Sequence, residues 1–526
     1  MDAAEDTLAD RYDDRLGAEA ASPPGRDPYP GTLASLWSRA VETWPGREFL
    51  VYEDSAGVVT RWTYAGFDEA VRELVGWLQR RGVEPEQRVH IVLPNHPAFL
   101  ALWLGTSLLG ATLVPSNPRA PARELRQHVE TARPVLAIAH EDMYATYRQA
   151  AHDVPIVKLK ANDIAFRGLR AQADRNESAV SLTTPASVLF TSGTTSAPKG
   201  VAVTQRNYAF AAEVMASAAD LDTHDRQLVV LPLFHANAQY YSVAPAISVG
   251  AAVVLIGAFS ASRFLAQAAR HGVTSASLFA APIRMILARS ARGREGLRLR
   301  HCWYAQSLSS AEFTAFSRLI GTSPRQLYGM TETIAAVLTS AHEPADHRSM
   351  GSVTPGCSVE IRDAETFKPT TPGQTGEIVV GGERGLSLFA GYLDQPRLTD
   401  RSFAGRWFRT GDLAQADENG NVFFVSRRAD ILKVAGENVA ATEIENVIRD
   451  HHSVRDVAVI GEADPISDQV PIAFVVLASG RREPEQLEKH CAAELAPFKR
   501  PRRFVFVDEL PQTSVGKIQK HLLKPR

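Results

Sequence analysis

The chain has 526 residues, more than one hydrophobic core usually supports, so its length predicts two or more domains. Its 57 lysine and arginine side chains nearly balance 59 aspartates and glutamates, and the net charge of -2 argues against nucleic acid or an anionic membrane surface as a partner. Cys302, Cys357 and Cys491 show no paired spacing, which argues against disulfides and a cysteine-bound metal and favours a reducing compartment.

The N-terminal residues lack the features of an export signal. Residues 1–20 carry seven acidic side chains where a signal peptide would have basic residues and an apolar run, so we expect a cytoplasmic protein. Residues 21–31, ASPPGRDPYPG, are dense in proline and glycine. We therefore expect residues 1–31 to be a disordered acidic tail and linker, with the folded chain beginning near Leu33.

From Leu33 onward, helical and strand patterns alternate. A helical stretch at residues 33–44 precedes the strand candidates FLVYED and VVTRWTY, an amphipathic stretch at residues 65–81 and the apolar strand VHIVLP. Buried strands are predicted at residues 227–231, 252–256 and 275–279. The alternation predicts an α/β fold of layered subdomains.

The longest apolar stretch, residues 243–259, is broken by proline, serine and glycine. It is shorter than the ~20 residues that a membrane helix needs, so we expect a buried helix and strand and no membrane span.

The pattern changes after Phe408. The turn DENGN, the strand VFFVS and the basic pair Arg427-Arg428 precede a small set of strands and one amphipathic helix at residues 442–449. We therefore place a domain boundary near Ala429, between a large domain of residues 32–428 and a small α+β domain of residues 429–526.

The segment TSGTTSAPKG, residues 191–200, directly follows the apolar strand SVLF and is suited to hold a polyphosphate. Its small residues let backbone amides approach phosphate oxygens, its hydroxyl groups add donors, and Lys199 supplies positive charge. The Walker A pattern GxxxxGK[ST] is absent. The alternative interpretation is a flexible turn rich in serine and threonine.

This segment resembles the phosphate loop of the adenylate-forming superfamily, which includes acyl-CoA synthetases, luciferases and nonribosomal-peptide adenylation domains. The resemblance extends from about Leu33 to Lys520, because further motifs follow in the order of that family. They are WTYAGF, LLGATLVPSNP, LPLFHANAQ, YGMTET, GEIVVGG, WFRTGD, SRRADILKVAGENV and LPQTSVGKI. The resemblance implies an ATP-dependent, AMP-forming acid–CoA ligase whose large domain binds ATP and the acid and whose small domain is mobile.

The resemblance also implies which residues bind the nucleotide. Glu332 would hold Mg²⁺ against the ATP phosphates, and a carboxylate is the type of ligand this ion prefers; the alternative is an exposed loop acid. Phosphate contacts are implied for Thr191, Ser192, Gly193, Thr194, Thr195 and Lys199, and further nucleotide contacts for Tyr328, Gly329, Met330 and Thr331.

Asp412 lies in WFRTGD, where we predict that a strand ends at a tight Thr-Gly turn. A carboxylate placed there can accept both ribose hydroxyls, and the resemblance gives Asp412 this role. Arg427 would contact the ribose or phosphate from the hinge side, and the alternative for it is an ordinary surface arginine. His235 would be a gate beside the acyl pocket, and the alternative for it is a structural histidine.

Lys517 lies in a Gly-Lys-Ile turn near the C-terminus, where a lysine by itself carries no functional signal. The resemblance makes it the catalytic lysine, which stabilises negative charge as pyrophosphate leaves, and it counts Glu332, Thr191 and His235 among the catalytic residues. The small domain would then rotate and present Gly436, whose missing side chain leaves room for the pantetheine of CoA.

Three features depart from the family pattern. Ser196 replaces a phosphate-loop glycine, and Ala429 occupies a hinge position that is commonly Asp or Lys. The stretch Ala-Gln-Ser-Leu at residues 305–308 replaces a glycine-rich adenine-binding turn, where Gln306 and Ser307 are expected to contact the nucleotide. The pattern is most similar to the carnitine or crotonobetaine–CoA ligase branch.

Several interpretations stay open. Gln239, Tyr240 and Tyr241 predict a small acid that is polar or aryl. One alternative keeps adenylate formation but uses another acceptor or acid. Examples are an amide synthetase and a relative that activates nitrite to diazotise an aromatic amine. Because the chain ends nine residues after Lys517, no fused carrier domain is expected and CoA is the default acceptor. Two further functional alternatives are an enzyme that only transfers a preformed acyl-adenylate and a scaffold that binds without catalysis. The oligomeric state is open between a monomer and a homodimer.

Overall fold

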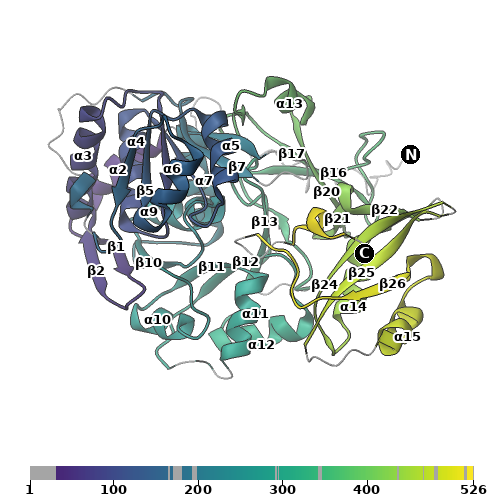
Figure 1. Ribbon diagram of the computed structural model, residues 1–526. Helices are drawn as coiled ribbons and strands as arrows, with labels where there is room; N and C mark the ends of the chain where they lie inside the picture. The colour runs from purple at the N-terminus through teal and green to yellow at the C-terminus, as the bar shows by residue number, and fades with distance from the viewer. Residues whose placement is uncertain are drawn as a thin grey trace, which may run out of the picture. The chain divides into compact units, whose positions relative to one another are not determined.

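The computed structural model describes residues 31–163, 166–169, 180–191, 198–290, 293, 295–341, 346–434, 437–465, 467–478, 484–513 and 518–524. The chain divides into two compact units (Figure 1). The larger contains Met1–His347, Gly351–Val359 and Val380–Phe408, and the smaller contains Arg348–Met350, Glu360–Val379 and Arg409–Arg526. The predicted α/β class, with a large N-terminal domain and a small C-terminal domain, is confirmed.

The larger unit contains a nine-stranded sheet in which β1, β9, β10, β11, β12 and β13 run parallel. Its order is β15-β14-β13-β12-β11-β9-β10-β1-β2. The strands are β1 (Glu48–Glu53), β2 (Val59–Thr63), β9 (Arg226–Val229), β10 (Ala252–Ile256), β11 (Ser275–Phe279), β12 (His301–Ala305), β13 (Arg325–Tyr328), β14 (Leu338–Thr339) and β15 (Ser352–Val353).

A second, seven-stranded sheet in this unit has the order β18-β8-β7-β4-β3-β5-β6. Strands β3 to β7 pair in parallel, whereas β8 pairs antiparallel with both β7 and β18. The strands are β3 (Arg88–Val92), β4 (Thr112–Pro115), β5 (Leu136–His140), β6 (Ile156–Leu159), β7 (Pro185–Thr191), β8 (Lys199–Thr204) and β18 (Gly391–Tyr392).

Helices cover both sheets. A middle layer of α2 (Leu33–Thr43), α4 (Pro97–Leu109), α7 (Gln205–Ala218), α9 (Ala244–Val249) and the π-helix η3 (Gln239–Val243) contacts strands of both sheets. Every residue of α4 is buried, as expected for a helix that is apolar all round. The outer layers contain α10 (Phe264–Arg270), α11 (Ala280–Arg289) and α12 (Ser310–Ile320) on the first sheet, and α5 (Ala122–Ala132) and α6 (Tyr144–Ala150) on the second.

Local sequence explains where several helices begin. α2 and α12 start with capping boxes, formed by Thr32 with Ser35 and by Ser309 with Glu312. Among the described residues, the larger unit also contains α3 (Tyr64–Arg80), the short α8 (Ala236–Ala238), α13 (Pro396–Arg401) and the 3-10 helices η1 (Glu141–Met143) and η2 (Arg167–Leu169). The strands predicted at residues 252–256 and 275–279 and the helix predicted at residues 65–81 are confirmed, the last displaced by one residue.

The smaller unit contains a sheet of order β23-β22-β25-β24, with β26 paired to β25. Its core is built from these strands and two helices. The elements are β22 (Ile431–Val434), β23 (Glu437–Ala440), β24 (Val454–Asp464), β25 (Asp468–Leu477), β26 (Arg503–Phe506), α14 (Ala441–Arg449) and α15 (Pro484–Glu494). The amphipathic helix predicted at residues 442–449 is confirmed as α14, whereas α15 was not predicted, because it buries only Leu487 and Cys491 among its residues and so shows a weak apolar pattern.

The chain passes between the two units within β16 (Ser358–Arg362), β17 (Gly376–Gly381) and β20 (Trp407–Ala416). Strand β19 (Phe403–Ala404) belongs to the larger unit, and β21 (Val422–Arg427) to the smaller one. The functional domain boundary near Ala429 stays a prediction. Over the residues that the structure describes, no helix is both long and apolar enough to cross a bilayer.

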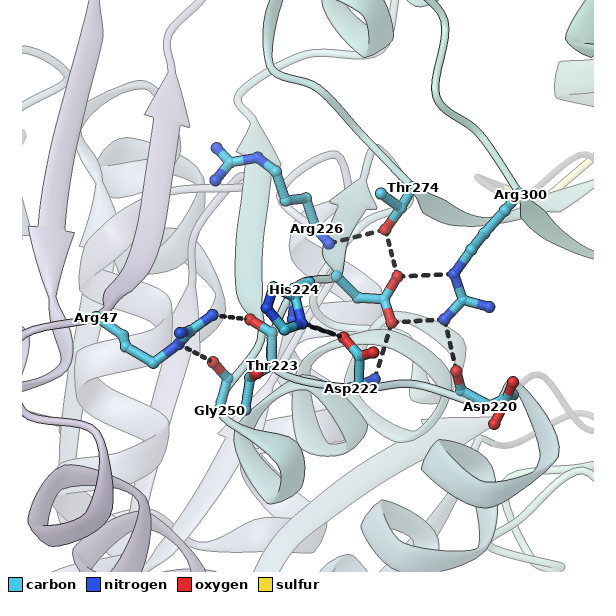
Figure 2. A network of polar contacts seen from close by, with 10 residues as sticks. Arg47, Asp220, Asp222, Thr223, His224, Arg226, Gly250, Thr274 and Arg300 are labelled. Carbon is cyan, nitrogen blue, oxygen red and sulfur yellow. Dashed lines mark hydrogen bonds and ion pairs between the residues drawn. The ribbon is translucent and has the colours of Figure 1, made fainter.

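A buried aspartate joins the beginnings of three parallel strands in the larger unit (Figure 2). Asp225, just before β9, accepts hydrogen bonds from Thr274 Oγ1 (2.6 Å), from Arg300 Nε (3.0 Å) and, at its other oxygen, from Arg300 Nη2 (2.6 Å). Thr274 and Arg300 directly precede β11 and β12. The carboxyl ends of these strands are left for the loops that carry the candidate site.

Candidate active site

The hairpin of β7 and β8 carries the two ends of the predicted phosphate loop. Thr191 lies directly opposite Lys199 in the antiparallel register, so the loop leaves and re-enters the sheet at one place. Ser192, Gly193, Thr194, Thr195 and the Ser196 departure lie outside the described residues. The structure thus places Thr191 and Lys199 side by side, and the phosphate contacts of the loop stay a prediction.

A tyrosine links Lys199 to Glu332. Strand β18 lies beside β8, with Tyr392 opposite Val201. The Nζ atom of Lys199 lies 5.2 Å from the centroid of the Tyr392 ring, within the range of a cation–π interaction. The Oη atom of Tyr392 donates a hydrogen bond of 3.0 Å to Oε1 of Glu332. Sequence reasoning missed Tyr392, because a tyrosine 60 positions from its partner gives no local signal.

The loop between β13 and β14 holds Glu332 in place. Glu332 is 5% exposed, so the alternative of an exposed loop acid is wrong. The backbone amide of Phe389 donates to the Glu332 carbonyl oxygen (3.0 Å), and that of Met330 donates to Thr333 Oγ1 (2.8 Å). Ile334, a buried β-branched residue, adopts φ of +64°, a strained conformation that concentrates at functional sites.

Gly329 is required by close packing in this loop. A Cβ atom there would lie 2.5 Å from Tyr241 Oη and 3.0 Å from the Ala335 carbonyl oxygen. The hydroxyl of Tyr240 contacts the same loop, donating to the Thr331 carbonyl oxygen at 3.4 Å. The structure therefore brings the loop of residues 328–332, through Gly329 and Thr331, against the two tyrosines that the sequence singled out.

The tyrosines belong to a segment with unusual geometry. η3 is a π-helix, a form often found at functional sites, and it directly follows α8, at whose start His235 lies. Gln239 is fully buried, with Nε2 donating to the Leu233 carbonyl oxygen (2.7 Å) and Oε1 accepting from Tyr208. Burial lowers the pKa of His235 to about 4, so the imidazole is neutral at neutral pH.

Asn95 positions the loop that carries His235, and sequence reasoning missed it. Its Nδ2 donates to the carbonyl oxygens of Leu231 and Ile256, both at 3.1 Å, while its Oδ1 accepts from the Leu233 amide at 2.9 Å. Asn95 follows β3 of the second sheet, whereas its partners follow or end strands of the first. One buried amide therefore joins the two sheets beside the candidate site.

Residues 305–308 form a turn with a left-handed backbone conformation, although none of them is glycine. β12 ends at Ala305, and Gln306 then adopts φ of +74°, which costs a side-chain-bearing residue about 1 kcal/mol. The Gln306 carbonyl oxygen accepts from Gln326 Nε2 (3.4 Å), and that of Ser307 accepts from Arg284 Nη2 (3.1 Å). The chain therefore makes a left-handed turn at Gln306 without a glycine.

In the smaller unit, Asp412 and Arg427 are cross-strand neighbours. They lie opposite each other on β20 and β21, with Arg427 Nε 3.3 Å from Asp412 Oδ1, and Asp412 is buried. The prediction that a strand ends at Asp412 was wrong, because pairing with β21 carries β20 on to Ala416. Gly411, with φ of +75°, bends the strand without ending it.

Glu377 holds this bend, although sequence reasoning did not single it out. The buried carboxylate accepts from the Gly411 amide and from Arg409 Nε, both at 3.0 Å, and Arg428 Nη1 lies 3.8 Å away. GEIVVGG therefore supplies the anchor of WFRTGD. Gly436 and Lys517 lie outside the described residues, and their roles stay predictions.

Glu332 fits the magnesium role as one carboxylate among oxygen ligands. Within the described ranges, no group of three or more His, Cys, Asp or Glu side chains is arranged to hold a metal ion by protein ligands alone. Mg²⁺ is commonly held by one or two carboxylates together with substrate phosphates and water. A single buried carboxylate beside the end of a phosphate-loop hairpin suits that arrangement.

Comparison with known proteins agrees with this geometry. Residues 37–393 match the family described as AMP-binding enzyme, and residues 443–517 match the AMP-binding enzyme C-terminal domain. The crotonobetaine/carnitine–CoA ligase of Salmonella paratyphi A is 32% identical over 514 residues, covering 94% of this chain and 98% of the relative.

Solved structures give the same fold. The o-succinylbenzoate CoA synthetase of Bacillus subtilis, in complex with the acyl-adenylate intermediate OSB-AMP, has a TM-score of 0.84 and 26% identity, covering 93% of this chain and 98% of that one. The same synthetase in complex with ATP and magnesium ion has a TM-score of 0.83 and 26% identity, covering 93% and 99%.

Proposed function

Because this chain belongs to the AMP-binding enzyme family, we propose that it is an ATP-dependent, AMP-forming acid–CoA ligase. In the first half-reaction a carboxylate oxygen of the acid attacks the α-phosphorus of ATP, and pyrophosphate leaves. In the second, the thiol of CoA attacks the acyl carbonyl carbon and loses its proton. AMP leaves with the bonding electrons, and the thioester remains.

The observation that carries this proposal is the grouping of Lys199, Tyr392 and Glu332 at the base of the phosphate-loop hairpin. Lys199 supplies positive charge to the polyphosphate, and Glu332 would hold a magnesium ion. The ion, when bound, neutralises phosphate charge and makes pyrophosphate a better leaving group. The loop residues from Thr191 to Thr195 add hydroxyl and amide donors.

The other roles rest on the order of the motifs. Asp412 accepts hydrogen bonds from the ribose hydroxyls, and Arg427 contacts the ribose or phosphate. Their adjacency supports a common role in binding the nucleotide. Nucleotide contacts also come from Gln306, Ser307 and residues 328–331. The Lys517 ammonium stabilises charge at the α-phosphate, and Gly436 leaves space for pantetheine. We place the mobile domain at residues 429–526.

The acid that we propose is small and carries a polar or aryl group. Three observations support this. The segment following His235 is polar and aromatic, with Asn237, Gln239, Tyr240 and Tyr241 all buried. The Tyr241 hydroxyl lies against Gly329, in the loop of Glu332. The curated relative named above is a ligase of polar acids by its name.

The test supplies ATP, Mg²⁺ and one acid at a time, with pyrophosphate release as the first readout. Carnitine, crotonobetaine, benzoate and o-succinylbenzoate form the polar and aryl set, and hexanoate and laurate form the aliphatic set. CoA is then added, and the thioester is identified by mass. We expect release with the polar or aryl set and stoichiometric AMP and thioester with CoA.

Absence of pyrophosphate release with every acid contradicts the adenylation proposal. Release that is followed by no thioester with CoA, but by a product when an amine is supplied, contradicts the choice of CoA as acceptor. Preference for the aliphatic acids contradicts the proposed substrate class.

A further inference from the structure

Tyr392 contacts two groups of the candidate site with two different parts of its side chain. Its hydroxyl donates to the carboxylate of Glu332 at 3.0 Å, and the face of its ring lies 5.2 Å from Lys199 Nζ. Nothing in the motif series draws attention to this residue. Because it touches both the carboxylate and the lysine, one rigid ring fixes the distance between a negative and a positive group.

The surrounding structure holds the ring firmly. Tyr392 is 7% exposed, and its backbone pairs with β8 through Val201. Its amide donates to Thr399 Oγ1 (2.9 Å), which ties β18 to α13. The Phe389 ring packs edge-on against it at a centroid distance of 4.9 Å. A side chain so confined can hold flexible partners without moving itself.

The chemistry of the hydroxyl suits a hydrogen-bond donor. A phenol hydroxyl has one proton to donate, and here the acceptor is the Glu332 carboxylate, 3.0 Å away. A carboxylate has about four acceptor positions, so accepting the tyrosine hydrogen bond is compatible with binding a cation as well.

We infer that Tyr392 is a positioning residue of the adenylation site. Its hydroxyl orients the Glu332 carboxylate for Mg²⁺, and its ring face holds the Lys199 ammonium at the end of the phosphate loop. The inference rests on the proposed function, since it assumes that Glu332 and Lys199 serve a magnesium nucleotide. Holding both groups in advance reduces the conformational entropy that they would lose on binding.

Two substitutions separate the two tasks. Tyr392→Phe removes the hydroxyl and keeps the ring, and Tyr392→Leu removes both. The readout is equilibrium binding of ATP by titration calorimetry, with Mg²⁺ and with the magnesium chelated, which requires no acid substrate. A positioning role of the hydroxyl predicts that Tyr392→Phe weakens ATP binding only when magnesium is present, whereas general damage to the fold weakens binding equally under both conditions.

In Tyr392→Phe we expect about ten-fold weaker binding of magnesium-ATP, the scale of one hydrogen bond to a charged group, with metal-free ATP binding unchanged. In Tyr392→Leu we expect a further loss of about three-fold that appears with and without magnesium, because the cation–π contact is also lost. Tyr64→Phe is the matched control: its buried hydroxyl donates to the Ala251 carbonyl oxygen at 2.8 Å, away from the site, and ATP binding should match wild type.

The outcomes are distinguishable. Equal affinity of Tyr392→Phe and wild type for magnesium-ATP overturns the inference, as does an equal loss with and without the metal. A wild-type protein that binds magnesium-ATP but activates no acid overturns the proposed ligase function and leaves the inference standing. If the wild type fails to bind ATP at all, both are overturned.

Discussion

Glu332 is a buried carboxylate, and burial of a charged group is costly without compensation. The Tyr392 hydroxyl provides one hydrogen bond, and the Lys199 ammonium lies over the same ring, 5.2 Å from its centroid. One tyrosine therefore contacts both a carboxylate and an ammonium group of the candidate site. A bound magnesium nucleotide would make use of both charges at once.

Lys517 is the residue whose substitution tests the mechanism most directly. Lys517→Ala should slow formation of the acyl-adenylate by roughly 10²–10³, the effect of losing one preorganised donor. Transfer to CoA from a supplied acyl-adenylate should stay nearly unchanged. Single-turnover rates of the two half-reactions provide the measurement, and Lys524→Ala, an exposed lysine seven positions later, is the control.

An equal loss in both half-reactions of Lys517→Ala would show that the lysine serves folding or CoA binding instead of adenylation. Unchanged rates in both would remove it from the mechanism.

At the scale of elements, the loop between β13 and β14 depends on its close approach to η3. Gly329→Ala places a Cβ atom 2.5 Å from Tyr241 Oη, so we expect a loss of about 1–3 kcal/mol in stability and weaker ATP binding. The double variant Gly329→Ala with Tyr241→Phe removes the hydroxyl and should recover part of both. Thermal unfolding and calorimetry give the two quantities.

The recovery should be incomplete, because the Ala335 carbonyl oxygen still lies 3.0 Å from the new Cβ atom. If the single variant is as stable as wild type, the packing argument for Gly329 is wrong.

The hydrogen bonds between Asp225, Thr274 and Arg300 (Figure 2) join three strands at a distance from the candidate site, so they should affect stability and not nucleotide binding. Asp225→Asn removes the carboxylate that accepts hydrogen bonds from two nitrogens of Arg300. We expect a loss of about 2–3 kcal/mol in the free energy of unfolding. Urea unfolding measures this loss. ATP affinity of the folded variant should be unchanged, because the network joins the beginnings of the strands.

The matched control is Asp222→Asn, whose side chain is 67% exposed, and its effect should stay below about 0.5 kcal/mol. A similar loss in both variants would contradict the special role of Asp225, and a loss of ATP affinity in Asp225→Asn would contradict its separation from the site.

Over the whole molecule, buried histidines make stability depend on pH. Burial lowers the pKa of His90 to about 3 and that of His128 to about 4, and both contact Ser116 Oγ, at 2.7 and 2.8 Å. Unfolded histidine titrates near 6.5, so between about pH 6.5 and 4 the unfolded chain binds protons that the folded chain does not. The free energy of unfolding should therefore decrease as the pH falls through this range. Above about pH 6.5 the two histidines should cause no further change.

Each such histidine contributes up to about 1.4 kcal/mol per pH unit. Urea unfolding between pH 7.5 and 5 measures how the free energy of unfolding changes with pH. His128→Asn should reduce this change by an amount equivalent to about one bound proton, even if the variant is less stable at every pH. An unchanged slope in this variant would show that His128 does not titrate differently in the two states.

Much of the fold could be predicted because its evidence lies in consecutive residues. The apolar run at residues 252–256 became β10 with the same bounds, and the motif order predicted the family that the comparisons show. The weakly patterned α15 and the continuation of β20 through Asp412 could not be predicted. The first has little apolar periodicity, and the second depends on pairing with β21.

The sequence by itself determined the layered α/β class, the two domains, the phosphate-loop candidate and the set of polar residues around His235, because periodicity and motif spacing are local properties. Only the tertiary structure decided that Tyr392 joins Lys199 to Glu332, that Asn95 joins two sheets beside the His235 loop and that Glu377 anchors the bend at Gly411. These contacts join residues between 34 positions apart (Glu377 and Gly411) and 193 positions apart (Lys199 and Tyr392), and chain folding, not sequence spacing, brings such residues together.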